Sequence, residues 1–193
     1  SNGYPISGGT GRDIIIGTRD LGAASAGRVL VLQLKPLGVG GWVNQGAAVL
    51  DYLAVKGAPA YAGDFTILAL AVNSAAAGIF LHMGFRDVNA NTTTWNSPAN
   101  WPVTVNAAPA RNAVVTGSMS LPADYAGQVD RMRRVYLCWD DNSTSTFADV
   151  YRVDNYRPYR LQGPEFRPYK VAYSGSFNAG KLIYSAVSGV APA

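Results

Sequence analysis

The feature that most constrains the fold of this chain is a series of short apolar runs rich in β-branched and aromatic residues. Gly, Pro, Asn and Asp residues, which favour turns, separate the runs. The runs cover residues 12–16, 28–34, 48–55, 65–72, 78–87, 112–120, 132–139 and 146–153. This pattern predicts an all-β fold, a jelly-roll β-sandwich of about eight or more antiparallel strands with little helix.

Side-chain alternation favours strands over helices in these runs. Within 78–87, apolar residues occupy alternate positions from Ile79 to Phe85, which is the period of two of a half-buried strand. The run 65–72 is apolar on both faces, which predicts a central strand. Residues 46–57 also fit a helical stripe, so helix remains an alternative there to the strand that we prefer.

Length and composition predict one domain without a need for disulfides or metals. The chain has 193 residues, of which 48% are hydrophobic and only 15% charged, against about 25% charged in a typical soluble domain. Residues 1–11 contain four glycines and little apolar material, so we expect a linker there. We expect a single sandwich domain over 12–193 with a C-terminal tail over 161–193, whose apolar piece 181–187 pairs with a neighbouring strand or a second chain.

Charge and hydropathy argue against two classes of partner. The formal net charge is +4, a mild bias that falls short of the basic footprint of a nucleic-acid-binding domain. The sequence has no uncharged apolar run of about 18 residues, and its start lacks the pattern of a signal peptide. We therefore expect neither nucleic acid as a partner nor membrane insertion.

The residues that usually carry catalysis are sparse. His82 is the only histidine and lies within a strand run, where a structural role is the expected one. Cys138 is the only cysteine, which rules out an internal disulfide, and its apolar surroundings predict a buried, inert thiol. We therefore predict a non-enzymatic protein. A glycan hydrolase or lyase that uses Asp140 or Asp154 is a weaker alternative, since Asp140–Asp141 first predicts a hairpin turn.

A long polar segment, 88–110, is the first candidate for ligand binding. Its two tryptophans offer flat rings that could stack on sugars, and its asparagines offer hydrogen bonds to hydroxyl groups. The site residues predicted here are Trp95, Trp101, Asn96, Asn100 and the preceding Arg86. It is equally open that one or both tryptophans cover the core, whereas Trp42 and Trp139 are expected in the core or at its edge.

A second candidate is the stretch 151–160, in which tyrosines and arginines alternate closely. Arginine stacked on tyrosine suits an acidic polysaccharide or a subunit contact better than nucleic acid. The site residues predicted here are Tyr156, Arg157 and Tyr159. No cofactor is required, but Asp149 and Asp154 provide the oxygen ligands of a possible structural Ca²⁺ site.

Two stretches of the sequence resemble known families. YPISGGTGR (4–12) resembles the SGGTG linker that recurs in bacteriophage tail fibres before a C-terminal receptor-binding domain. Residues 112–160, with VVTGSMSLPADYAG and then RRVYLCWDDNSTSTFADVYRVDNYRPYR, resemble the second half of a galactose-binding-like jelly roll of the carbohydrate-binding-module type, including a closing-strand aspartate at Asp154.

These resemblances imply a receptor-binding domain of a phage or virion fibre. Such a domain would be extracellular on the virion, would attach to a host cell-surface glycan, and would be a homo-oligomer, commonly a trimer. The alternative is a structural virion protein, a capsid or decoration jelly roll that acts through subunit contacts.

Overall fold

The strands of the chain form a series of antiparallel hairpins. The computed structural model describes residues 4–6, 9–20, 26–35, 38–73, 78–107, 114–141, 149–161 and 166–188. Within them the helical structure is limited to a short α1 (Tyr61–Asp64) and a 3₁₀ turn, η2 (Asp130–Met132). The prediction of an all-β sandwich with little helix is confirmed.

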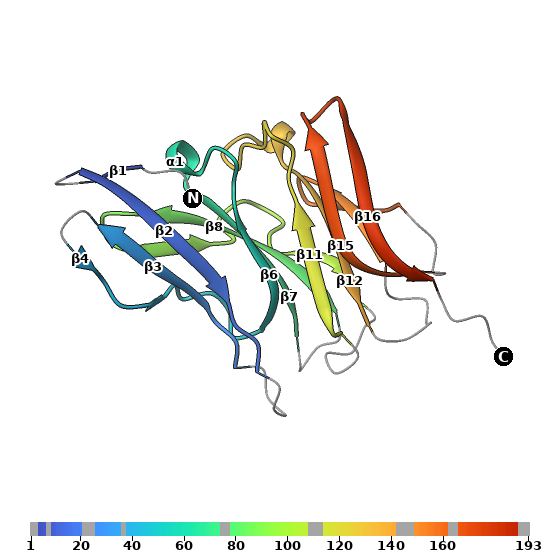
Figure 1. Cartoon of the computed structure of the whole chain (residues 1–193), viewed down its shortest axis with the longest axis horizontal. Helices are drawn as coiled ribbons and strands as arrows, with labels where there is room; N and C mark the ends of the chain where they lie inside the picture. Colours follow the sequence, from blue (N-terminus) through green and yellow to red (C-terminus); the bar gives the residue numbers. More distant parts are fainter. Residues whose placement is uncertain are drawn as a thin grey trace.

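The strands group into three sheets and a hairpin (Figure 1). The first sheet contains β1 (Tyr4–Ile6), β2 (Gly9–Gly17), β3 (Val29–Lys35), β4 (Gly38–Val39) and β5 (Val43–Asn44). The second contains β6 (Asp51–Gly57), β7 (Thr66–Val72), β8 (Ile79–Asp87), β9 (Thr92–Trp95) and β10 (Val103–Asn106). The third contains β11 (Thr116–Ser120), β12 (Arg134–Asp140), β13 (Asp149–Asp154) and β14 (Arg157–Arg160). The C-terminal hairpin is formed by β15 (Phe166–Gly175) and β16 (Gly180–Ser188).

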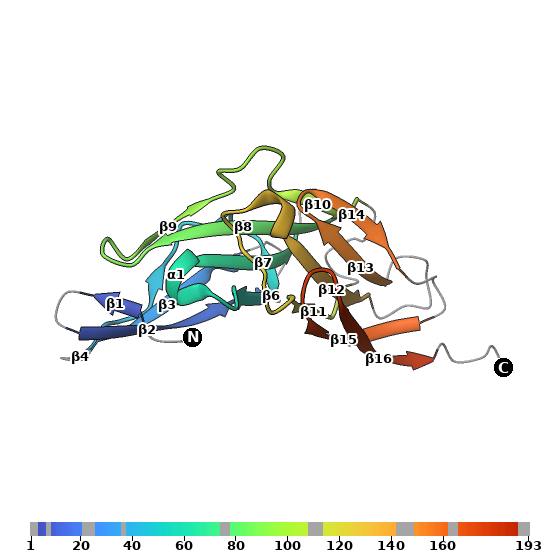
Figure 2. The ribbon, with the colours of Figure 1, turned by 90° about the horizontal axis from the view of Figure 1, so that it is seen from above.

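These four layers stack in the order of the chain, as the colours of Figures 1 and 2 show. Apolar clusters around Val29, Val31 and Tyr61 join the first sheet to the second. The largest cluster joins the second sheet to the third. A smaller one, with Cys138 and Val171, joins the third sheet to the C-terminal hairpin. The two middle sheets are thus covered on both faces.

Strand β7 shows why the sequence demands this stacking. All seven of its residues are buried. Leu68 and Leu70 point into the cluster against the third sheet, while Ile67 and Ala69 point toward the first sheet. A strand with apolar side chains on both faces needs a partner layer on each side, because successive side chains of a strand point in opposite directions.

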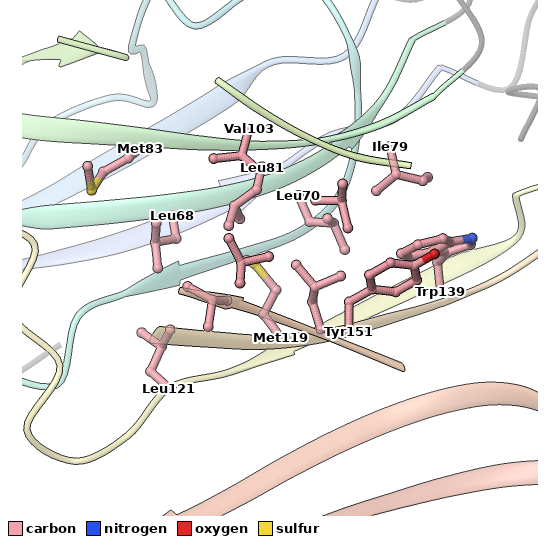
Figure 3. Packing of buried hydrophobic residues seen from close by; sticks show 14 of the residues in the cluster. Leu68, Leu70, Ile79, Leu81, Met83, Val103, Met119, Leu121, Trp139 and Tyr151 are labelled. Atoms are coloured by element: carbon pink, nitrogen blue, oxygen red, sulfur yellow. The ribbon is translucent and has the colours of Figure 1, made fainter. Parts of the chain in front are cut away.

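The largest cluster is centred where the second and third sheets face each other (Figure 3). Leu68, Leu70 and Leu81 from the second sheet meet Met119 and Trp139 from the third. The Trp139 ring is fully buried and is stacked on that of Tyr151, with ring centroids 4.9 Å apart. This confirms the prediction that Trp139 lies in the core.

Several expectations about local structure are wrong. Residues 4–6 and 9–11, expected to contain no strand, pair with each other in β1 and β2. The segment 88–110, expected to be one long loop, contains β9 and β10, which both pair with β8. Trp42, expected in the core or at its edge, is 46% exposed. Short edge strands such as β1 and β9 carry few apolar residues, so hydrophobic alternation does not reveal them.

Other expectations agree with the structure. The ambiguous stretch 46–57 is a strand over Asp51–Gly57, with a register shift between Tyr52 and Ala54. The apolar piece 181–187 pairs with a neighbouring strand, β15. Residues 112–113 and 146–148 of the expected strand runs lie outside the described residues.

Candidate functional site

The two tryptophans of segment 88–110 fold inward. Trp101 is only 7% exposed and belongs to the largest apolar cluster. Trp95 is half-buried against the first sheet, and its indole Nε1–H donates a hydrogen bond of 2.9 Å to the Gln45 carbonyl oxygen. Of the two roles left open by the sequence, the structure shows that these tryptophans cover the core. In this position Trp101 offers no flat face to a ligand, and Trp95 offers only part of its ring.

Asn96 connects this segment to strand β8. Asn96 accepts a hydrogen bond from the Met83 amide at 3.2 Å, and its Nδ2 lies 3.0 Å from His82 Nδ1. Asn96 and Asn100 both have positive φ, a conformation that asparagine tolerates better than most residues. Asn100 is exposed and lies beside the buried Trp101. Asn96 therefore holds the segment against β8.

Arg86 lies between the first and second sheets rather than at a surface. Its Nε donates to Asp13 Oδ2 at 2.6 Å, and both side chains are fully buried. Its Nη1 donates to Gln45 Oε1 at 2.9 Å, and its Nη2 to Asn91 Oδ1. Tyr61 donates to the same Asp13 oxygen at 2.6 Å. Removing one partner of such a buried pair costs about 3–5 kcal/mol, so this network is structural.

The second predicted stretch, in contrast, forms part of an open surface. Directly opposite residues of antiparallel strands point to the same face. In the third sheet this places Tyr136, Arg152 and Tyr159 in one cross-strand row. Arg134, Asp154 and Arg157 form the next row. We call the part of these rows that solvent reaches, together with Tyr156, the arginine–tyrosine face: Arg134, Arg152, Asp154, Tyr156, Arg157 and Tyr159.

Ring contacts and one carboxylate hold the guanidinium groups of this face in place. Arg152 lies over the Tyr159 ring at 5.0 Å, and Arg157 over the Tyr156 ring at 5.5 Å. Asp154 pairs with Arg134 at 2.6 Å and with Arg152 at 3.0 Å. With three arginines against one aspartate, the face remains positive. Tyr156 and Tyr159 are 36% and 41% exposed, so their rings are accessible.

The C-terminal hairpin covers the other half of the same side of the third sheet. Val171 covers Cys138 and Val150, and the Tyr173 ring is stacked on that of Tyr136 at 4.4 Å. The hairpin turn places Phe177 beneath Arg134, with the guanidinium 3.9 Å from the ring centroid. A shallow pocket of about 370 Å³ opens at this end, lined by Asp130, Arg131, Arg133, Asp154, Asn155 and Phe177. The face is therefore an open, positively charged strip with a hollow at one end.

The carboxylates of the predicted calcium site are not brought together. Asp149 and Asp154 are five residues apart on β13 and so point to opposite faces of the third sheet. Asp149 pairs with Arg160, and Asp154 pairs with Arg134 and Arg152. No group of three or more His, Cys, Asp or Glu residues suited to a metal ion occurs among the residues that the structure describes.

The remaining candidates for chemistry are buried. Burial raises the pKa of the Cys138 thiol to about 12 and lowers the pKa of His82 to about 4, so both stay uncharged near neutral pH. Asp140 is buried and pairs with Arg167 at 2.8 Å. Asp140 and Arg134, the neighbour of Asp154, are six residues apart on β12, which is about 20 Å. That exceeds the separation of about 5–10 Å that glycosidase carboxylates require.

The sequence pattern predicted Tyr156, Arg157 and Tyr159 as site residues, but it did not predict Arg134 or Phe177. A signal for Arg134 was present, since Arg134 and Tyr136 have the same two-residue spacing as Arg157 and Tyr159. The pairing that aligns them could not be deduced from spacing alone.

Comparisons with protein-family models, with curated proteins and with solved structures found no match for this chain. In the described residues, no helix has both the length and the apolar character needed to cross a membrane.

Proposed function

We propose that this protein is a non-enzymatic binding domain that attaches to an acidic cell-surface saccharide through the arginine–tyrosine face. The observation that carries the proposal is the alternation of guanidinium groups and accessible tyrosine rings across neighbouring strands. Tyrosine rings stack against the apolar faces of sugars, and arginine binds carboxylate or sulfate groups in a bidentate manner. The wider setting that we propose is host attachment by a phage or virion fibre.

The rigidity of this face supports a binding role. Cation–π contacts and the Asp154 carboxylate fix Arg152 and Arg134 before any ligand arrives. Groups that are already ordered lose less conformational freedom on binding. Arg157 is exposed and has no salt bridge to a described carboxylate, so it is the side chain best placed to receive an anionic group.

Titration calorimetry with polygalacturonate, an acidic polysaccharide, and with neutral dextran tests the proposal. We expect binding of the acidic polymer, weakened about tenfold or more by Tyr159→Ala and by Arg157→Ala, because central aromatic and arginine contacts carry most of the energy of an interface. Trp42→Ala is the matched control, since it removes an exposed ring between β4 and β5 of the first sheet, outside the arginine–tyrosine face.

Equal affinity of all three variants would place the ligand elsewhere and contradict the assignment. The alternative function, a structural virion component that acts through subunit contacts, predicts that neither polymer binds. Equal binding of dextran and polygalacturonate would refute the acidic specificity.

A further inference from the structure

The outer edge of β16 differs from the other sheet edges in the described residues. The edge strands β1, β4 and β5 of the first sheet have two or three residues, β9, β10 and β14 have four, and β14 also contains Pro158. The edge strand β11 has five residues and lies beside β15, and the part of β2 that extends beyond β1 lies beside β6. The edge strand β6 has an irregular register. Short length, proline and irregularity are the usual means by which proteins prevent edge-to-edge pairing. β16 has nine residues and none of these features between Gly180 and Ser185.

Hydrogen bonds of β15 show which backbone groups of β16 point outward. The amides of Val171 and Tyr173 donate to the hydroxyls of Ser118 and Ser120, at 3.3 and 2.9 Å, and so point away from β16. Val171 lies opposite Tyr184, and Tyr173 opposite Leu182. These are therefore the non-hydrogen-bonded pairs of the hairpin. It follows that the backbone groups of Leu182 and Tyr184 also point away from β15.

We infer that β16 pairs antiparallel with β16 of a second copy of this chain, about a two-fold axis at Ile183. In this register Leu182 faces the second copy's Tyr184, and outward-pointing backbone groups meet in hydrogen-bonded pairs. Ile183 then faces its own symmetry mate. The two hairpins form one continuous four-stranded sheet, an arrangement that is independent of the proposed saccharide site.

Side-chain chemistry identifies a second copy as the partner. Ile183 is 67% exposed, the most exposed large apolar side chain among the described residues, and the axis buries it against an identical side chain. On the inner side, Leu182 extends the apolar cluster that covers the third sheet. Lys181 lies opposite Ser185 in this register, so no like charges meet. Strand pairing of this type is isologous and forms dimers.

Cysteine cross-linking tests the register. Residues of a non-hydrogen-bonded pair have Cα atoms about 4.5 Å apart, which is within disulfide range. Ile183→Cys should therefore form a disulfide-linked dimer under mild oxidation. Lys181→Cys lies on the same strand and face as Ile183. In the proposed register its Cα atom is about 13 Å from the Cα atom of residue 181 in the second copy, so it should not cross-link. The native Cys138 is buried and does not interfere.

Sedimentation analysis of the unmodified protein and of Ile183→Lys completes the test. We expect the unmodified protein to be a dimer at high protein concentration and Ile183→Lys to be a folded monomer. The variant would bring two like charges together at the two-fold axis. A monomeric or trimeric unmodified protein, or cross-linking of Lys181→Cys as fast as Ile183→Cys, overturns the inference. Loss of saccharide binding without a change in the dimer would contradict the proposed function but not the inferred pairing of β16.

Discussion

At the scale of single residues, the polar groups buried between the layers determine how the protein responds to pH. The His82 ring is buried, with Nδ1 close to Asn96, and its Nε2 has no hydrogen-bond partner among the described residues. Burial favours the neutral ring, which lowers its pKa to about 4 from an ordinary value of about 6.5. Protonation is therefore easier in the unfolded chain than in the folded one.

We predict that His82 makes the fold sensitive to mild acid. The neutral His82 ring contributes its full share to the free energy of unfolding above pH 6.5. As the pH falls from about 6.5 toward 4, this contribution is lost, which lowers the free energy of unfolding by about 3 kcal/mol. Urea unfolding near pH 7 and near pH 4.5 measures this loss, and His82→Gln should be less sensitive to the change. If His82→Gln loses as much free energy of unfolding between pH 7 and pH 4.5 as the unmodified protein does, groups other than His82 cause the sensitivity to acid.

At the scale of elements, close packing between sheets depends on small residues where strands cross. A Cβ added at Gly117 of β11 would lie 2.9 Å from Leu53 Cβ and 3.0 Å from Leu70 Cδ2. The third sheet therefore approaches the second closely at a position without a side chain. An added methyl group has to displace atoms from both sheets.

Gly117→Ala should destabilise the protein by about 1–3 kcal/mol, the usual cost of overpacking a filled core. Gly63→Ala is the matched control, because a Cβ at Gly63 of α1 meets no atom within 4 Å. The control should be neutral or slightly stabilising, by up to about 1 kcal/mol. Chemical denaturation measures both. A Gly117→Ala protein as stable as the control would mean that the sheets can move apart at little cost.

The elements also show what a sequence of this kind reveals. Buried strands such as β7 and β8 were predictable, because their apolar faces impose a period of two. β14 (Arg157–Arg160) was not predictable as a strand, since all four of its residues are exposed. Its residues were still recognised as a binding candidate from their chemistry. The burial of the tryptophans in segment 88–110 was not predictable, because their neighbours in the sequence are polar.

At the scale of the whole molecule, each layer is joined mainly to the layers next to it. The C-terminal hairpin packs on the third sheet through a small cluster. An outer layer that packs on one side only should open more readily than the layers between. Cys138 lies beneath this hairpin, so its reactivity reports whether the hairpin is in place.

We predict that thiol reagents label Cys138 slowly in the native protein, because burial both blocks access and raises the pKa of the thiol to about 12. Tyr173→Ala removes the ring that is stacked on Tyr136 and should speed labelling about tenfold, while Trp42→Ala on the first sheet should not. Equal rates in the two variants would show that the hairpin does not open independently of the other layers.

The agreement between layer order and chain order has a consequence for how the protein is made. A ribosome releases the first sheet before the second, the second before the third, and the hairpin last. Each new sheet therefore emerges beside a finished surface that already presents the complementary apolar face. Growth from one end in this way requires no strand to wait for a partner encoded far downstream.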